Sequence, residues 1–283
     1  MQKIGIIGNG YVGGATALLK SSRVSTILYD IDSEKCSPRG IGIEDLLDCN
    51  FIFVCVPTPM NKVGGCATHM VEGVVDDLSK KGYDTERVIV KSTVPVGTSR
   101  RLGVMFMPEF LTEQNWEDDF LNQQNWILGT NGRNDKVRDE VYQLFESAWN
   151  HGGLNHRPHM TFSTTEEAEL TKYTRNCFLA TKVSFFNEVE EFCRKKDINY
   201  RKVRELTIMD KRIGSSHTAV PGPDGKRGYG GTCFPKDMAS FHHQMHVEND
   251  LPSAVIGGAL RRNKLHDRPE RDWEEKKGRA VIE

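Results

Sequence analysis

Short apolar runs, separated by polar and glycine-rich stretches, dominate the first 130 residues of the chain. They occupy residues 3–7, 26–30, 51–56, 87–93, 102–107 and 125–130. Runs of this length are typical of strands that are buried on both faces of a parallel sheet. Stretches that fit helices, such as 11–20 and 134–149, lie between them. The alternation predicts an α/β fold with a doubly wound parallel sheet over residues 1–162.

The pattern changes near residue 163. Thr164 is followed three residues later by Glu167, which is the signature of a capping box at a helix start. The segment 166–196 then contains no Gly or Pro and keeps apolar residues at helical spacing. These features predict a mostly helical second domain over residues 163–283. We expect a glycine-rich loop at 214–232 and a solvated, frayed charged tail at 267–279.

Composition and charge narrow the function classes. The 283 residues suffice for about two domains, and 38 basic against 39 acidic residues give no electrostatic argument for binding nucleic acid or an anionic membrane. No apolar run approaches the length of a membrane span, and the first apolar run opens into a glycine turn, unlike a signal peptide.

Cysteine and histidine usage points to a reduced, cytoplasmic protein without a metal site. The seven cysteines are scattered and include no CxxC pair. His242, His243 and His246 lie close together in the sequence but lack a nearby cysteine or an HExxH pattern. Zinc sites use such spacings, so we predict no metal here.

A dinucleotide-binding pattern begins the chain. Gly8, Gly10 and Gly13 form GxGxxG between an expected strand and an expected helix, and Asp30 follows 22 residues after Gly8. Glycines let the backbone approach a pyrophosphate, the helix start stabilises its charge, and the acid accepts from a ribose hydroxyl. Because Asp30 would repel a 2′-phosphate, the pattern favours NAD over NADP in a Rossmann-like domain. The alternative is a tight turn that binds nothing.

The second chemical cluster is the run GGTCFPKD at residues 230–237. Cys233 follows a glycine loop, and Pro235 suits a first helical turn. A thiol at a helix start beside Lys236 is expected to have a lowered pKa and to act as a nucleophile. Asp237, one turn later, is either a base or a carboxylate that stabilises the helix start.

Eight ordered motifs make residues 1–265 resemble the UDP-glucose 6-dehydrogenase family of NAD-dependent nucleotide-sugar dehydrogenases. They are GNGYVGG at 8–14, Asp30, FVCVPTP at 53–59, VKSTVPVGT at 90–98, PEFLTE at 108–113, EAELTKYTRNCFLATKVSFFNE at 167–188, DKRIG at 210–214 and GYGGTCFPKD at 228–237. The resemblance implies oxidation of the C6 alcohol of UDP-glucose to UDP-glucuronate with two NAD. GDP-mannose dehydrogenases share the Cys-Pro-Lys-Asp motif, so GDP-mannose stays an alternative substrate.

The resemblance also assigns catalytic roles. Cys233 would capture the C6 aldehyde as a thiohemiacetal, which a second oxidation converts to a thioester that water hydrolyses. Lys172 would hold the C6 oxygen, and Asn176 lies one helical turn later on the same face. Asp237 would help to deprotonate the alcohol through a water. Glu109 would assist aldehyde oxidation and thioester hydrolysis, and Thr93 would place its hydroxyl near the reacting centre. Without the family match, Lys172 would be interpreted as a solvated surface lysine.

Binding positions follow in the same way. Substrate contacts would come from Glu109, Phe110, Leu111, Lys172, Asn176, Tyr229 and Arg212, the last contributed across a homodimer interface of the helical domain. Cofactor contacts would come from Gly8, Gly10, Tyr11, Val12, Gly13, Asp30, Lys35, Thr58, Thr93, Glu113 and Lys236.

The sequence departs from the family after residue 240, where we find no counterpart of the family's C-terminal UDP-binding domain. We therefore expect either a minimal enzyme or a chain that needs another chain to complete its cleft, with weak substrate binding if it acts alone. Two further alternatives are a β-hydroxyacid dehydrogenase, which needs a lysine but no cysteine nucleophile, and a non-catalytic NAD-binding subunit.

Overall fold

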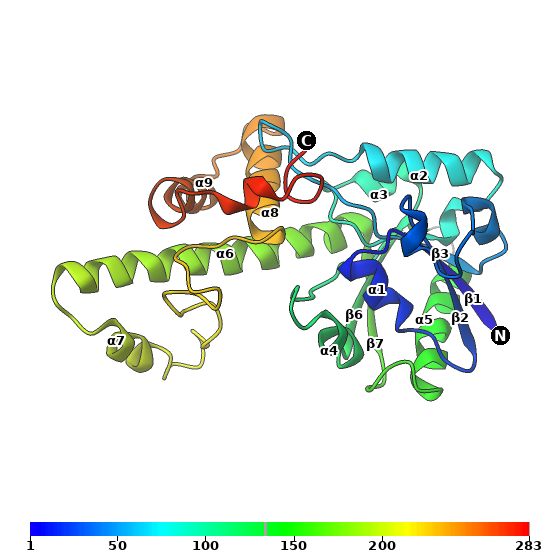
Figure 1. The fold of residues 1–283 in the computed structure, drawn as a ribbon, viewed down its shortest axis with the longest axis horizontal. Helices are drawn as coiled ribbons and strands as arrows, with labels where there is room; N and C mark the ends of the chain where they lie inside the picture. The colour runs from blue at the N-terminus through cyan, green and yellow to red at the C-terminus, as the bar shows by residue number, and fades with distance from the viewer. Residues whose placement is uncertain (133–134, 283) are drawn as a thin grey trace. The chain divides into compact units, whose positions relative to one another are not determined.

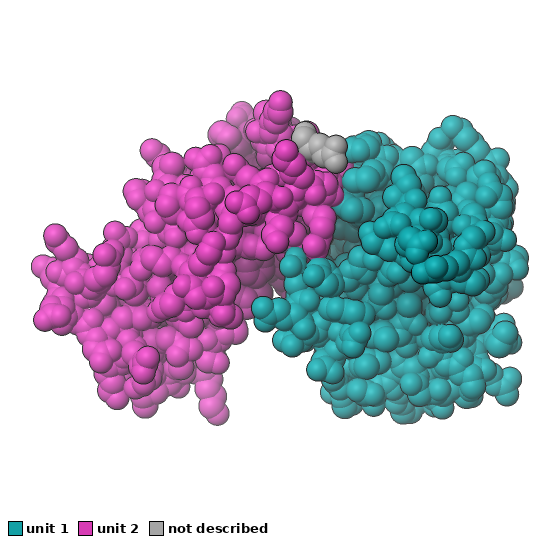
Figure 2. All heavy atoms as spheres, viewed as in Figure 1, with its two compact units in different colours: residues 1–58, 68–172 teal, residues 59–67, 173–283 magenta. Residues whose placement is uncertain are grey.

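The computed structural model describes residues 1–132 and 135–282, which form two compact units. Unit 1 comprises Met1–Thr58 and Thr68–Lys172, and unit 2 comprises Pro59–Ala67 and the chain from Tyr173 onward (Figure 2). The compact units and the domains expected from sequence divide the chain differently. The structural division lies inside a long helix, beyond residue 162, and a loop of the N-terminal half belongs to unit 2.

Unit 1 is built on a seven-stranded sheet of order β2-β1-β3-β4-β5-β6-β7 (Figure 1). The strands are β1 (Gln2–Ile7), β2 (Val24–Tyr29), β3 (Phe51–Val54), β4 (Val88–Val90), β5 (Met105–Phe106), β6 (Asn125–Thr130) and β7 (His159–Thr164). All neighbouring pairs are parallel except β5–β6, which is antiparallel. The predicted doubly wound parallel sheet is confirmed, with β5–β6 as the antiparallel pair among the described strands, because the chain after β5 enters β6 from the opposite end.

Two of the expected strands are shorter than their apolar runs. Helix α3 (Thr98–Leu102) takes up the start of the run 102–107, and Gly103 ends it with a φ of 69°. This left-handed conformation suits glycine and delays β5 until Met105. Strand β4 likewise ends at Val90, which leaves the polar residues that follow it at the end of the sheet.

Helices cover both faces of the sheet, as a doubly wound fold requires (Figure 1). They are α1 (Tyr11–Ala17), α2 (His69–Lys80), α3, α4 (Trp116–Leu121) and α5 (Asp135–Asn150). Because side chains alternate between the faces of a strand, Ile4 and Ile6 join one core with α1, α4 and α5. Ile52 and Val54 join the other core, with α2.

Helix α6 (Thr165–Lys195) begins with the capping box predicted from sequence. Thr164 Oγ1 accepts from the Glu167 amide at 3.2 Å, and a Glu167 carboxylate oxygen accepts from the Thr164 amide at 2.8 Å. The first turns of α6 also hold α3. The fully buried Glu169 carboxylate accepts from the amides of Gly97 and Ser99 at 2.6 and 2.8 Å.

We expect Glu169→Gln to lower the free energy of unfolding of unit 1 by about 1–3 kcal/mol, because an amide NH₂ then faces one of two buried N–H donors. Urea unfolding followed by circular dichroism measures the change. Glu167→Gln, on the same helix, is the matched control, since glutamine still serves in a capping box. Equal stability of the two variants would contradict this role of Glu169.

Unit 2 contains the rest of α6 with α7 (Tyr200–Thr207), α8 (Cys233–His243) and α9 (Ala254–Arg262). Its small core joins α6 to α8 and α9 through Cys177, Ala180, Met238 and Ala259. Within the described ranges, no helix combines the length and apolar character needed to cross a membrane.

The predicted solvated, frayed tail is wrong. Arg268, Trp273 and Ala280 are buried. Arg268 forms a bidentate ion pair with Asp272, with distances of 2.8 and 2.7 Å. The tail is also fixed by backbone hydrogen bonds at Met60, whose amide donates to Ala280 and whose carbonyl accepts from Ile282. The many charged residues at 267–279 suggested a solvated segment, but the Arg268 charge is paired with Asp272 within the fold.

Candidate functional site

The glycine turn after β1 has the geometry that a bound dinucleotide requires. Gly8 has a φ of 97°, which few residues other than glycine adopt. A Cβ at Gly13 would collide with the carbonyl oxygen of Gly8, so this glycine permits the close packing of α1 on the turn. Around Gly10, by contrast, no atom lies within 4 Å of where a Cβ would stand. The exposed backbone at Gly10 leaves room for a pyrophosphate at the start of α1.

The Asp30 side chain, just beyond β2, helps to shape this turn. Its two oxygens accept from the amides of Asn9 and Asp32 at 2.7 and 2.9 Å. Asn9 in turn donates from its side chain to the carbonyl of Lys35 at 2.8 Å, and Lys35 pairs with Asp32 at 3.3 Å. The structure therefore brings Asp30 and Lys35 to the glycine turn. These residues fit an adenosine ribose beside Asp30 and a pyrophosphate beside Gly10.

Two glycine substitutions should separate folding from cofactor binding. Gly13→Ala is expected to destabilise the fold by about 2 kcal/mol or more, because the new methyl group has no room. Gly10→Ala should change the free energy of unfolding by less than about 1 kcal/mol, because Gly10 has a φ of −90° and open space around it. The same substitution should weaken NAD binding at least about tenfold, because the new methyl group would stand where the pyrophosphate binds. Thermal unfolding and calorimetric titration with NAD measure the two effects. Unchanged NAD affinity in Gly10→Ala would contradict the assignment.

Polar residues follow the carboxyl ends of β3 and β4, where ligands of such sheets bind. Thr58 donates from its hydroxyl to the carbonyl of Thr93 at 2.7 Å, and Ser92 donates to the carbonyl of Val56 at 2.6 Å. Both threonines are buried. The structure thus ties together two positions that the sequence assigned to the cofactor.

Glu109 and Lys172 form a buried ion pair in unit 1. The Lys172 ammonium donates to a Glu109 carboxylate oxygen at 2.6 Å and to its carbonyl at 2.7 Å. The other carboxylate oxygen accepts from the amide of Leu111 at 2.8 Å. Burial raises the pKa of Glu109, but the charge and hydrogen bond of Lys172 outweigh it, so the pKa lies below its usual value. Without the family resemblance, the sequence pattern would have placed Lys172 on the solvated surface. In the structure it is only 3 % exposed.

Lys91 is a third charged group of this part of unit 1, and sequence reasoning missed it. It lies directly after β4 and is 3 % exposed. Burial lowers the pKa of Lys91, and the charges of Glu109 and Lys172 act on it in opposite directions. A charged residue at the end of a fully apolar strand was the available signal.

Asp237 of α8 lies between two donors in unit 2. Its carboxylate oxygens accept from the Asn176 side chain and from the Lys236 ammonium, each at 2.6 Å, and it is 1 % exposed. Burial lowers the pKa of Lys236, but the negative charge of Asp237 and the hydrogen bond to it oppose this effect, and the pKa is raised. Asp237 therefore has a cation and an amide donor beside it.

Cys233 is the first residue of α8, and its side chain is partly exposed. The loop before it is fixed by Asn263, whose side chain accepts from the amide of Tyr229 and donates to its carbonyl, both at 2.9 Å. Arg268 packs against Gly230, where a Cβ would meet its guanidinium. Sequence reasoning missed Asn263 and Arg268, because neither lies in a motif with recognisable chemistry.

The other predicted positions vary in exposure. Tyr229 is buried, with a hydroxyl that has no partner among the described residues. Arg212 is highly exposed and pairs with Asp210 at 2.5 Å. The remaining positions all lie in unit 1: Tyr11 and Glu113 are exposed, and Val12, Phe110 and Leu111 are half-buried. The Phe110 ring lies 5.6 Å from the Lys172 ammonium.

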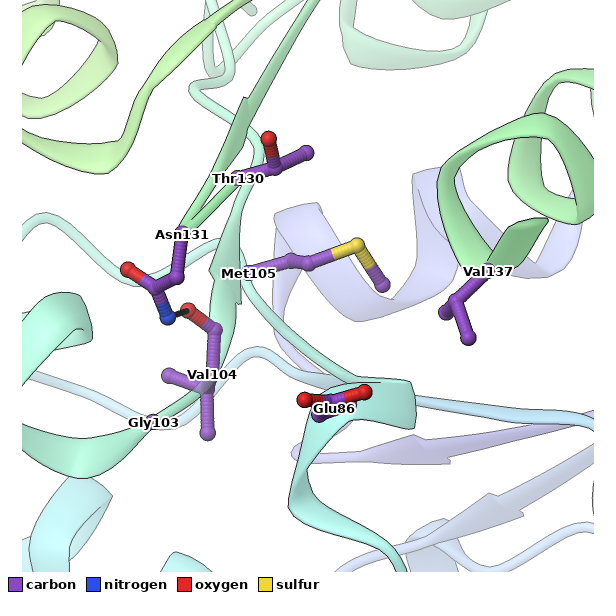
Figure 3. A pocket seen from close by; sticks show the side chains of 7 residues that line it. All are labelled: Glu86, Gly103, Val104, Met105, Thr130, Asn131 and Val137. Atoms are coloured by element: carbon purple, nitrogen blue, oxygen red, sulfur yellow. Dashed lines mark hydrogen bonds between the residues drawn. The ribbon is translucent and has the colours of Figure 1, made fainter. Parts of the chain in front are cut away.

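Two cavities differ in what they can hold. The cavity in Figure 3, in unit 1, has a volume of 30 Å³ and lies beside Asn131, whose side chain donates to the carbonyl of Val104 at 3.1 Å. It has room for about one water molecule. A cavity of 880 Å³ lies in unit 2 between α8, α9, residues 60–64 and the C-terminal segment.

Comparison with known proteins gives consistent matches. The NAD binding domain of the UDP-glucose/GDP-mannose dehydrogenase family matches residues 41–148, and the central domain of that family matches residues 166–264. The chain is similar to UDP-glucose 6-dehydrogenase of Pseudomonas aeruginosa, with 32 % identity over 263 residues, covering 86 % of this chain and 55 % of that protein.

Similarity to UDP-glucose 6-dehydrogenase TuaD of Bacillus subtilis is 28 % over 286 residues, covering 85 % of this chain and 58 % of TuaD. The structure of a UDP-glucose dehydrogenase from Pyrobaculum islandicum superposes with a TM-score of 0.79 at 25 % identity, covering 94 % of this chain and 68 % of the other. The chain spans about half the length of the curated relatives it matches.

Proposed function

Because the chain belongs to the UDP-glucose/GDP-mannose dehydrogenase family and carries its NAD-binding and central domains, we propose that it oxidises the C6 alcohol of UDP-glucose to the carboxylate. The observation that carries the proposal is the arrangement on α8. Cys233 begins the helix, and Asp237, one turn later, is buried between Asn176 and Lys236. A nucleophile and a carboxylate on one helical face suit a covalent oxidation of an aldehyde.

The first oxidation removes a proton and a hydride from the C6 alcohol. Asp237 accepts the hydroxyl proton through a water, and its carboxylate is held by the Lys236 ammonium at 2.6 Å. The buried ammonium of Lys172 stabilises the negative charge that develops on the C6 oxygen. NAD, when bound at the glycine turn, supplies the hydride acceptor for each of the two oxidations.

The second oxidation depends on Cys233. Its thiolate adds to the C6 aldehyde, and the resulting thiohemiacetal again carries a C–H bond that can lose a hydride. The product is a thioester, which water hydrolyses to the acid and the free thiol. Glu109, ionised beside Lys172, is the base for that water, and Thr93 provides a hydroxyl near the reacting carbon.

The remaining assignments concern binding. Phe110, Leu111, Tyr229 and Arg212 would contact the substrate, and Tyr11, Val12, Lys35, Thr58 and Glu113 would contact NAD. None of the seven cysteines, all of which the structure describes, is in a disulfide, which supports a role in the reducing cytoplasm. A domain arrangement of 1–162 for cofactor and 163–283 for catalysis remains part of this proposal.

The direct test is NAD reduction by the purified chain with UDP-glucose, with GDP-mannose and without sugar. The proposal expects NADH formation with UDP-glucose above both controls. A higher rate with GDP-mannose would favour the alternative substrate, which the family also includes. NAD binding without turnover of either sugar would favour a non-catalytic NAD-binding subunit.

We further propose that the chain forms a homodimer through α6. Phe178, Phe185 and Phe192 are 57–65 % exposed and recur every seven residues, the spacing with which two helices pack against each other. An apolar stripe of this kind on a helix is typical of an interface. The second copy is the occupant we assign, since the stripe and the exposed Arg212 both lie in the helical unit.

Phe185→Asp is expected to convert the dimer to a monomer, because an ionised side chain would be buried at the centre of the stripe. Light scattering coupled to size-exclusion chromatography measures the mass. Val255→Asp, at an exposed apolar position on α9, is the control and should leave the mass unchanged. A wild-type chain of 32.0 kDa in solution would contradict the dimer.

A further inference from the structure

The 880 Å³ cavity of unit 2 has the size of a small-molecule site. Its walls come from α8, α9, the loop at residues 60–64 and the C-terminal segment, including Trp273. The buried tail that closes it was expected to be solvated, so sequence alone gave no sign of a cavity here.

The cavity lies on a different face of α8 from the catalytic cysteine. Pro235, Ala239 and His242 line it, and at about 100° per residue these three positions fall within about 60° of one another. Asp237 points away, toward Asn176 of α6, and Cys233 lies four residues before Asp237 on that same face. A ligand in the cavity would therefore bind apart from Cys233.

An aromatic ring from the loop before α8 forms part of the cavity wall. Tyr229 lines the cavity and is 4 % exposed, but its hydroxyl has no hydrogen-bond partner among the described residues. Asn263 fixes the backbone of Tyr229 through two hydrogen bonds, so the ring is held in place. The ring therefore gives the cavity a fixed aromatic wall, while the hydroxyl oxygen is fully buried.

Charge around the cavity is strongly positive. The lining residues include Lys62, Arg261, Lys264 and Lys277, and within the described part of the chain none of the four forms an ion pair. The one acid in the lining, Glu274, pairs with Arg271 at 3.7 Å. Four basic side chains without carboxylate partners favour a ligand with several negative charges.

We propose that this cavity is a second binding site, for a nucleoside diphosphate. The diphosphate would lie against Lys264, Arg261 and Lys277, three of the basic side chains that line the cavity. The base would pack against Trp273 and Leu260. This combination of cations and an aromatic wall matches the phosphates and the base of such a ligand.

Calorimetric titration with UDP and with ADP, in the presence of saturating NAD, tests the site without any turnover, so its outcome is independent of the proposed reaction. Lys264→Glu and Lys277→Glu should each weaken binding of at least one nucleotide about tenfold or more. Lys276→Glu is the matched control, because Lys276 does not line the cavity, and it should change binding less than about threefold.

Fluorescence locates the ligand. Trp273 is the tryptophan of unit 2, while Trp116, Trp126 and Trp149 lie in unit 1. The nucleotide should change the emission of the wild-type chain, and Trp273→Phe should abolish that change. Absence of binding, equal weakening by Lys276→Glu, or binding untouched by both Lys264→Glu and Lys277→Glu would overturn the proposal.

Discussion

Cys233→Ser is expected to lower formation of the sugar acid on the order of 10³-fold or more. The serine hydroxyl is not ionised near neutral pH and does not add to the aldehyde as a thiolate does, so no thioester forms. The position at the start of α8 remains suitable for serine, and NAD binding in unit 1 should be unchanged. Mass spectrometry of the sugar product, with calorimetric titration of NAD, measures both effects.

Cys66→Ser is the control for this variant, since Cys66 is also a partly exposed cysteine of unit 2. It should retain acid formation within about threefold. Undiminished acid formation by Cys233→Ser would remove the covalent mechanism and favour a β-hydroxyacid dehydrogenase, which uses a lysine and no cysteine.

Lys172→Met is expected to lower the free energy of unfolding by about 3–5 kcal/mol, because it leaves the Glu109 carboxylate buried without its cation. The double variant Lys172→Met/Glu109→Gln should recover part of that loss, since no buried charge remains. Both should lose about 10²–10³-fold in kcat through the missing ammonium. Urea unfolding and initial rates measure these effects, and equal stability of single and double variants would contradict the coupling.

The ion pair between Glu109 and Lys172 also predicts that the free energy of unfolding falls at acid pH. The folded pKa of Glu109 is lowered from an unfolded value of 4.5, so its contribution is complete above that pH. The contribution is lost as the pH falls below 4.5 through the folded pKa. In Glu109→Gln the decline in stability over this range should be shallower than in the wild-type chain. Unfolding in urea between pH 3 and pH 7 gives the comparison.

Local patterns predicted the parts of the fold that local chemistry determines. The capping box at Thr164 and the open turn at Gly10 follow from residue types at fixed spacings. The direction of β6 does not, because its apolar run is the same in a parallel and an antiparallel pair. The tail 267–279 was misjudged because a charged sequence does not reveal that Arg268 will find Asp272 inside the fold.

The candidate site shows the same limit. Cys233 and Asp237 were recognisable from adjacent sequence, since four residues of helix bring them to one face. Lys172 had no such signal, because its partner Glu109 lies 63 residues away and only the fold brings the two together. Asn263 was missed for the same reason, because its role comes from contacts across the chain. Lys91 was missed although its place at the end of an apolar strand was a signal of burial.

The most direct measurement of the central claim is the number of NADH formed per UDP-glucose consumed by the purified chain. The account predicts two NADH and one UDP-glucuronate for each UDP-glucose, because Cys233 holds the intermediate between the two oxidations. One NADH per sugar, with the aldehyde as the released product, would contradict it.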